Sequence, residues 1–299
     1  MEKEIKAILY RYFAALAVSL CAAPVHAEDA PGELLRRAWE EYGLQAFSNA
    51  DEFFADAADV AQGEERWQAL MGRALVVHYQ MPGRDPEAAI PLYEALLGEV
   101  GDAGEWRGQV LARLGDCHAE LVPPQIDRAR SLYREALAVL PGQSLMVRET
   151  ALRLLTTYLQ RSDRAEIARG LVVADEFAAQ MEGTPFASVF HGLRAEMAFF
   201  SDDYPMLAEA LDQQYRAGIS NIKVKETVLF RLARLHEVEL GDYALAEDYY
   251  RRLAAEVPSS QKAYFAVLRA DELKAGKLDS DYAPPLSPQV EDATRKESP

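Results

Sequence analysis

A small residue recurs along this chain at a nearly constant spacing, and that period constrains the fold more than any other feature. The recurring residues are Ala50, Ala89, Ala129, Ala168, Ala208 and Ala246. Successive members are 39, 40, 39, 40 and 38 residues apart. A fixed period of this length is typical of repeat architectures, in which each unit buries its apolar face against its neighbours. The spacing therefore predicts a stack of similar structural units.

The residues that follow the recurring alanine have the pattern of a packed helix. In DRARSLYREALAVLP, steps of four, three and five residues relate Ala129, Tyr133, Ala136 and Pro141. The same steps relate Ala246, Tyr250, Leu253 and Pro258. The first two steps also relate Ala50, Phe54 and Ala57. Two other units have Val172 and Asp212 in place of the aromatic residue. Residues four and seven apart share one helix face, where a small side chain lets a partner helix approach and an aromatic ring fills the gap. Proline then ends the helix.

This pattern resembles the second helix of a tetratricopeptide hairpin, which has the same order of small, aromatic, small and proline positions. The first helices agree, because a large, large, small spacing is found at Leu111, Leu114 and Gly115, at Leu152, Leu155 and Thr156, and at Leu229, Leu232 and Ala233. The family period is about 34 residues, so we expect longer loops near residues 81–85 and 122–125. The resemblance implies an all-α fold: an α-α superhelix, or solenoid, of about six hairpins over residues 28–275, ending in a capping helix over 261–274.

The first 27 residues have the features of a signal peptide. Its basic residues are Lys3, Lys6 and Arg11. The apolar run over 13–23 is shorter than the roughly 20 residues that a membrane-spanning helix needs. We predict cleavage after Ala27, which would place the mature chain in the periplasm or outside the cell. Acylation of Cys21 is the alternative, although the bulky Leu20 before it disfavours that reaction.

Composition argues against several kinds of partner. The chain carries 48 acidic and 32 basic residues, a net charge of −16, so it lacks the basic surface that nucleic acid or anionic lipid requires. No segment after the signal peptide has the apolar length of a membrane span. Cys117 is the only cysteine left in the mature chain, so no intramolecular disulfide is expected. Residues 276–299 hold four prolines and few large apolar side chains, which predicts a disordered tail.

The mature sequence shows no glycine-rich phosphate loop, no paired metal-ligand motif and no nucleophile elbow. Cys117 and His118 are adjacent, but neighbouring residues on a helix point about 100° apart and do not face each other. His78 and His191 have no second ligand at a spacing that builds a zinc site. We therefore expect no catalytic residue, no metal and no cofactor. A helical-repeat enzyme that cleaves polysaccharide or peptidoglycan with carboxylates along a groove is the alternative function.

The resemblance also implies where a partner would bind. The concave side of such a superhelix is lined mainly by the first helices, and related repeats hold an extended peptide or a helix there. Transferring the groove positions through Gly115 and Ala233 gives the predicted partner-binding residues Asp116, Ala119, Glu120, Phe230, Arg234, Glu237, Phe265 and Arg269. We expect Arg234 and Arg269 to be exposed in this groove.

The C-terminal segment GDYALAEDYYRRLAAEVPSSQKAYFAVLRADEL is similar to hairpins of periplasmic envelope-assembly proteins, among them outer-membrane assembly lipoproteins and the Tol-Pal cell-division coordinator. This resemblance implies an exported protein–protein interaction or scaffolding module of the bacterial cell envelope. Its partner would be a protein or peptide of that compartment.

Overall fold

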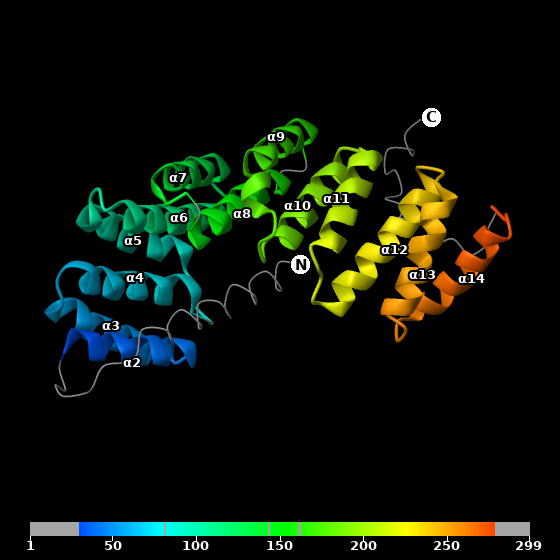
Figure 1. Cartoon of the computed structure of the whole chain (residues 1–299). Coiled ribbons are helices and arrows are strands. Elements are labelled where there is room, and N and C mark those ends of the chain that lie inside the picture. The colour runs from blue at the N-terminus through cyan, green and yellow to red at the C-terminus, as the bar shows by residue number, and fades with distance from the viewer. Residues whose placement is uncertain (1–29, 81, 143, 161–162, 279–299) are drawn as a thin grey trace, which may run out of the picture. The chain divides into compact units, whose positions relative to one another are not determined.

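The structure is a computed structural model that describes residues 30–80, 82–142, 144–160 and 163–278. Within these ranges the chain forms thirteen helices and no strand (Figure 1), which confirms the all-α prediction. The predicted signal peptide over residues 1–27 and the chain beyond residue 278 lie outside the described residues. No helix in the described part is both long and apolar enough to cross a membrane.

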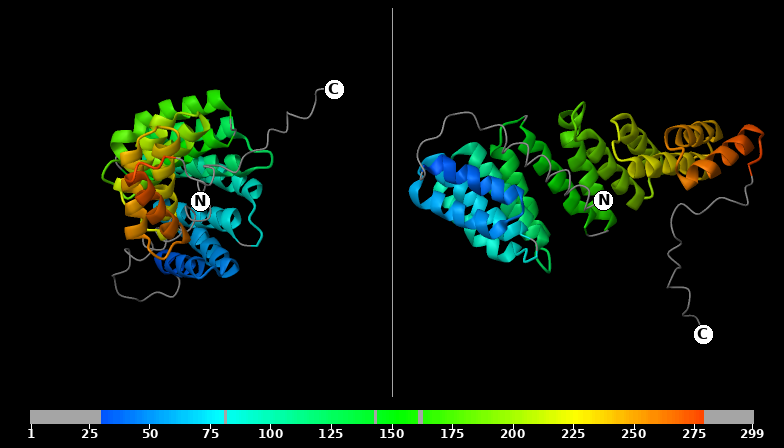
Figure 2. Two further views of the ribbon diagram at one scale, coloured as in Figure 1. Left: turned by 90° about the vertical axis from the view of Figure 1, so that its right-hand side faces the viewer. Right: turned by 90° about the horizontal axis from the view of Figure 1, so that it is seen from below.

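The chain divides after Thr157 into two compact units. The first unit contains α2 (Pro31–Gly43), α3 (Phe47–Val60), α4 (Gly63–Tyr79), α5 (Pro86–Val100), α6 (Gly104–Glu120), α7 (Ile126–Val139) and most of α8 (Leu145–Leu159). From α2 to α7 each helix packs against the next one in sequence, and α2 also contacts α4. Figures 1 and 2 show these helices lying side by side. This unit is therefore held together mainly by neighbours in sequence, as a repeat architecture requires.

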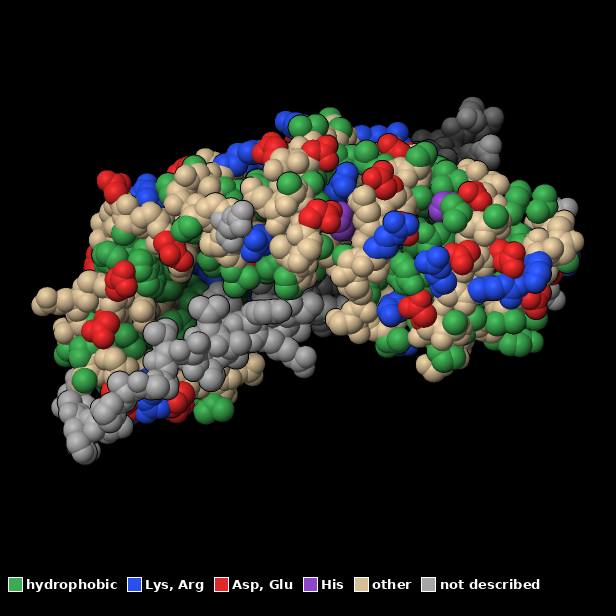
Figure 3. All heavy atoms as spheres, in the orientation of Figure 1, with side chains coloured by type: hydrophobic (Ala, Val, Ile, Leu, Met, Phe, Trp, Pro, Cys, Tyr) green, Lys and Arg blue, Asp and Glu red, His purple; other side chains and the backbone are tan. Residues whose placement is uncertain are grey.

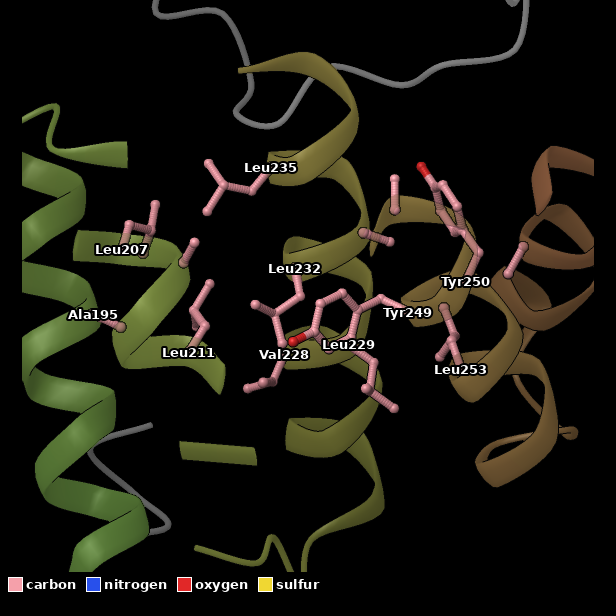
Figure 4. Packing of buried hydrophobic residues seen from close by; sticks show 14 of the residues in the cluster. Ala195, Leu207, Leu211, Val228, Leu229, Leu232, Leu235, Tyr249, Tyr250 and Leu253 are labelled. Atoms are coloured by element: carbon pink, nitrogen blue, oxygen red, sulfur yellow. The ribbon is translucent and has the colours of Figure 1, made fainter. Parts of the chain in front are cut away.

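The second unit begins at Tyr158 and follows the same rule. Its helices are α9 (Arg164–Met181), α10 (Ala187–Phe200), α11 (Tyr204–Arg216), α12 (Ile222–Val238), α13 (Tyr243–Glu256) and α14 (Gln261–Lys274). Each packs against the next, and α12 also contacts α14. In the core, Leu229 and Leu232 of α12 are buried between α11 and α13 (Figure 4). The last helix, α14, has the bounds predicted for the capping helix.

Each recurring alanine lies on an odd-numbered helix from α3 to α13, the second helix of a predicted hairpin. Ala50, Ala89, Ala129 and Ala246 have no exposed surface, and Ala208 is also buried. Ala168 is the exception because it is exposed, so its assignment as a packing residue is wrong.

Gly170 occupies the packed position on α9 instead of Ala168. A Cβ atom at Gly170 would lie 2.7 Å from Cβ of Tyr158 and 3.1 Å from Sδ of Met197. α9 turns Ile167, Gly170 and Ala174 toward the core, which puts its buried face two residues out of register with the period. The fourth and fifth units both lack the aromatic residue that marks the register in the others, so only the spacing placed their alanines. The spacing placed Ala208 correctly but misplaced Ala168.

Aspartate begins four of these second helices. Asp85, Asp163, Asp203 and Asp242 are the N-cap residues of α5, α9, α11 and α13, and each side chain accepts a hydrogen bond from a backbone N–H in the first turn. Such caps satisfy donors that have no partner within the helix. Before α13, Gly241 adopts a φ of 65°, a left-handed conformation that glycine tolerates better than other residues. The tight turn predicted at residues 241–243 is thus present.

The packed alanines give a test of the repeat register. Replacing Ala129 or Ala246 with leucine should lower the free energy of unfolding by about 1–3 kcal/mol, because added methylenes must push two packed helices apart. The control is Ala168→Leu, at the corresponding place in the period but on an exposed surface, which should change it by no more than about 0.5 kcal/mol. Urea unfolding followed by circular dichroism measures all three. Equal effects at the three positions would contradict the packing described.

Candidate functional site

The structure places the predicted partner-binding residues in two groups, one in each unit. Asp116, Ala119 and Glu120 lie on α6 of the first unit. Phe230, Arg234 and Glu237 lie on α12 of the second unit, and Phe265 and Arg269 lie on α14. The contact between α12 and α14 brings the members of the second group together.

Glu237 is the centre of a buried network in the second group. Its Oε2 accepts hydrogen bonds from Nη1 of Arg234 at 3.2 Å and from the Tyr250 hydroxyl at 2.6 Å. Its Oε1 accepts from Nε of Arg269 at 2.8 Å. One carboxylate therefore links α12, α13 and α14. Ionised groups can be held out of water only when they are paired and hydrogen-bonded in this way.

The two arginines are interior residues. Arg234 is 3% exposed and Arg269 is 1% exposed, so the expectation that they face solvent in a groove is wrong. Arg269 also donates to the carbonyl oxygens of Lys277 and Leu278, at 3.2 and 2.7 Å. Its guanidinium group thus holds the chain that leaves α14 against that helix. These arginines are buried because α14 packs against the face of α12 that carries Glu237, and both guanidinium groups bind that carboxylate.

Aromatic side chains form the more accessible part of this group. The ring centroids of Phe230 and Phe265 are 6.0 Å apart, and the Tyr250 ring is 6.3 and 6.0 Å from them. Phe230 and Phe265 are half-buried. Nζ of Lys262 lies 5.1 Å from the centroid of Phe230, a cation–π distance. We call Phe230, Phe265 and Lys262 the α12–α14 aromatic face.

The first unit contains a network of the same kind around Asp116. Its carboxylate accepts from the Tyr133 hydroxyl at 2.8 Å and from the Tyr79 hydroxyl at 3.2 Å. Arg113 and Arg153 each approach it to 3.1 Å. Burial alone would raise the pKa of Asp116, but the guanidinium groups of Arg153 and Arg113 outweigh it and hold that pKa below its ordinary value. Asp116 is therefore an ionised, buried structural group.

The two networks share a plan that sequence reasoning missed. In each, an arginine precedes the acidic residue by three positions on one helix, a tyrosine from the next helix donates to the acid, and a second arginine comes from the helix after that. The tyrosines, Tyr133 and Tyr250, are the aromatic residues of the repeat pattern. A polar hydroxyl in a buried aromatic position was the signal that could have revealed both networks, because such a group needs a partner.

Glu120 belongs to a third cluster, in the first unit. It forms an ion pair with Arg84, and its Oε2 lies 3.1 Å from Nε2 of His78. His78 is fully buried, and Sγ of Cys117 lies 3.6 Å from its Nδ1. The thiol therefore meets His78, from α4, and not its sequence neighbour His118, which contacts Gln125. Burial raises the pKa of the Cys117 thiol well above its ordinary range, so the group is a neutral thiol and not a thiolate nucleophile.

The described residues contain no group of three or more His, Cys, Asp or Glu side chains arranged to hold a metal ion. The carboxylates of Asp116 and Glu237 are each neutralised by two arginines. What this arrangement can do chemically is hold helices in fixed register and present aromatic and charged side chains at their edge.

Truncating Arg269 tests the buried network. Arg269→Met leaves Glu237 with one fewer counter-charge inside the protein and should lower the free energy of unfolding by about 3–5 kcal/mol. The matched control is Arg251→Met, which removes two solvent-accessible pairs, with Glu247 at 2.9 Å and with Asp271 at 3.0 Å, and should cost no more than about 1 kcal/mol. Chemical denaturation of both variants decides the matter. Similar small losses would show that the network does not stabilise the fold.

His78 makes the stability depend on pH. Burial lowers its pKa from 6.5 to about 3, so between these values the unfolded chain binds a proton that the folded chain does not. The contribution of neutral His78 to the free energy of unfolding is therefore fully present above pH about 6.5. It decreases by up to about 1.4 kcal/mol per pH unit as the pH falls toward 3. Burial also lowers the pKa of His191 and His236, which adds to the slope.

A His78→Gln variant should therefore show a shallower loss of stability than the unaltered chain between pH 6.5 and pH 4. The remaining slope should come from His191 and His236 and, near pH 4, from carboxylates such as Asp116 whose pKa is held low in the folded chain. Urea midpoints measured at four pH values for each protein give the two slopes. An unchanged slope in the variant would mean that His78 is not buried in its neutral form.

Comparison with known proteins shows similarity at the level of structure. No family model and no curated protein matches the sequence. The apo form of RapI is similar with a TM-score of 0.51 and 12% identity, over 90% of this chain and 93% of that one. Pseudomonas aeruginosa pilF has a TM-score of 0.53 and 16% identity, with 83% of this chain and 97% of that one covered.

The C-terminal part of a TPR repeat-containing protein from Cytophaga hutchinsonii is also similar, with a TM-score of 0.54 and 13% identity, over 89% of this chain and 96% of that one. At such identities the likeness establishes the fold. The chain is built from helical hairpins of the tetratricopeptide type, as the repeat pattern predicted.

Proposed function

We propose that this tetratricopeptide-like chain is an exported interaction or scaffolding module of the bacterial cell envelope. It would hold a peptide or a helix of a protein partner against its first helices. Three lines of support are independent of one another: the hairpin fold, the signal-peptide features of residues 1–27, and the α12–α14 aromatic face. Stacked hairpins are a common scaffold for peptide binding because the side chains of successive first helices form one surface.

The α12–α14 aromatic face carries this proposal. Aromatic residues are enriched at the centres of protein interfaces, where they bury a large area with few rotatable bonds. Here the rings of Phe230 and Phe265 pack on Tyr250, whose hydroxyl is fixed on Glu237. The face is therefore pre-organised, which reduces the entropy that binding must remove. Figure 3 shows acidic and basic side chains interspersed over α12–α14, which suits a mixed polar and apolar peptide.

A groove enzyme receives no comparable support. Cleavage of a glycan needs an acid and a base that face the substrate and can exchange protons. The two predicted carboxylates that are buried, Asp116 and Glu237, are each bound by tyrosine and arginine. They are held in place for structure, and we do not assign them a proton-transfer role.

Removing the aromatic rings tests the binding face. A Phe230→Ala/Phe265→Ala variant should lose most of its partner capture in a crosslinking pull-down from the native envelope, because two anchor rings are removed. The control is Tyr264→Ala on α14, a residue that is 74% exposed and lies outside the aromatic face. Melting temperatures, measured in parallel, confirm that each variant is folded. Undiminished capture by the folded double variant would contradict the proposal.

Intact-mass analysis of protein from its natural compartment tests export. We expect a chain that begins at Glu28, because signal peptidase prefers a small residue such as Ala27 at the cleavage position. A chain that retains Met1 would contradict export by this route. A mass increase at Cys21 matching a diacylglyceryl group would show the lipoprotein alternative instead.

A further inference from the structure

A pocket of about 250 Å³ lies between α10, α11 and α12 of the second unit, apart from the aromatic face. Its apolar wall is made by Phe199, Leu207, Leu211 and Leu235. Figure 4 shows Leu207 on α11 facing Leu235 on α12, with Leu211 lower on α11. A cavity of roughly 150 Å³ lined by such side chains is large enough to take a benzene ring. The leucines are only 1–4% exposed, so a ligand would reach the half-buried Phe199 and Tyr204 before the leucine wall. The α10–α12 pocket can therefore accept the end of one apolar side chain.

The polar residues of the pocket are Tyr204, Arg231 and Glu239. Arg231 is already neutralised, because its Nη1 lies 2.6 Å from Oε1 of Glu196 and its guanidinium group lies over the Phe199 ring. Its charge is thus satisfied within the protein and is not available to an anionic ligand.

Glu239 is different, because it is exposed and has no ion pair with any described residue. It is the C-cap residue of α12, where the helix dipole also favours a positive charge. Its carboxylate is the main cause of a raised pKa at Tyr204, which agrees with their common place in the pocket wall. The charge left unbalanced at this pocket is therefore negative.

We infer that the α10–α12 pocket is a second recognition site, which takes the end of an apolar side chain of a partner polypeptide, next to a basic group of the same partner. The apolar part would rest mainly on Phe199, in front of the leucine wall, and the cation would pair with Glu239. This inference rests on the proposed function in one respect, which is that the ligand belongs to a protein. The acidic net charge of the chain, −16, favours the same kind of partner through long-range attraction.

The site can be tested with a small compound on the purified full chain, without knowledge of the partner. The compound is 2-phenylethylammonium, and 3-phenylpropanoate is the control of similar size and opposite charge. In an NMR titration we expect the cation to shift the amide signals of Leu207, Leu235 and Glu239. The anion should bind about twofold to fivefold more weakly, because one exposed ion pair contributes a difference of that size.

Charge reversal provides the decisive variant. Glu239→Lys alters an exposed residue, so the protein should remain folded, and it should reverse the preference so that the anion binds more tightly. The matched control is Glu209→Lys on the exposed surface of α11, which should leave the preference unchanged. Equal binding of the two compounds, shifts that appear only at Phe230 and Phe265, or the same response to both lysine variants would each overturn the inference.

The pocket and the proposed function can fail separately. Selective binding of the ammonium compound, together with the absence of any captured partner, would support the pocket and contradict the interaction module. Partner capture that depends on Phe230 and Phe265, combined with no binding of either compound, would support the module and overturn the pocket.

Discussion

The close approach of a small residue to a tyrosine ring on the following helix is the contact on which the rest of the structure depends. At Gly115 even a Cβ atom would lie 2.5 Å from the Tyr133 ring, so α6 and α7 can pack at this distance only because the side chain is absent. The same approach carries the Tyr133 hydroxyl to Asp116, at 2.8 Å. Helix spacing and the buried polar network are thus consequences of one contact.

This arrangement separates stability from recognition. Buried charges are costly unless every one is paired, and in both units the acid is satisfied by tyrosine and arginine from three consecutive helices. The networks therefore fix helix positions and leave little charge for a ligand. Recognition falls to side chains at the helix edges: the rings of Phe230 and Phe265 on one face, and Glu239 beside an apolar pocket on another.

Much of the fold could be predicted because helix periodicity and spacing are local properties. The second helices, the turn at Gly241 and the bounds of α14 all follow from residues within one repeat. Burial of Arg269 could not be predicted in this way, because it depends on a carboxylate 32 residues earlier in the sequence. The contact of Cys117 with His78, 39 residues earlier, has the same origin. Ala168 was misplaced because only the spacing indicated it, without an aromatic residue to confirm the register, and α9 packs through Gly170 two residues later.

Site-specific photo-crosslinking in the native envelope tests the central claim most directly, which is that the first-helix face holds the partner. A benzophenone amino acid would replace Lys262 at the α12–α14 aromatic face or, in a second variant, Val172 on α9, which is 66% exposed. The account predicts a covalent adduct with one discrete protein from position 262 and none from position 172. Adducts from position 172 alone, or from neither position in a folded and exported chain, would contradict it.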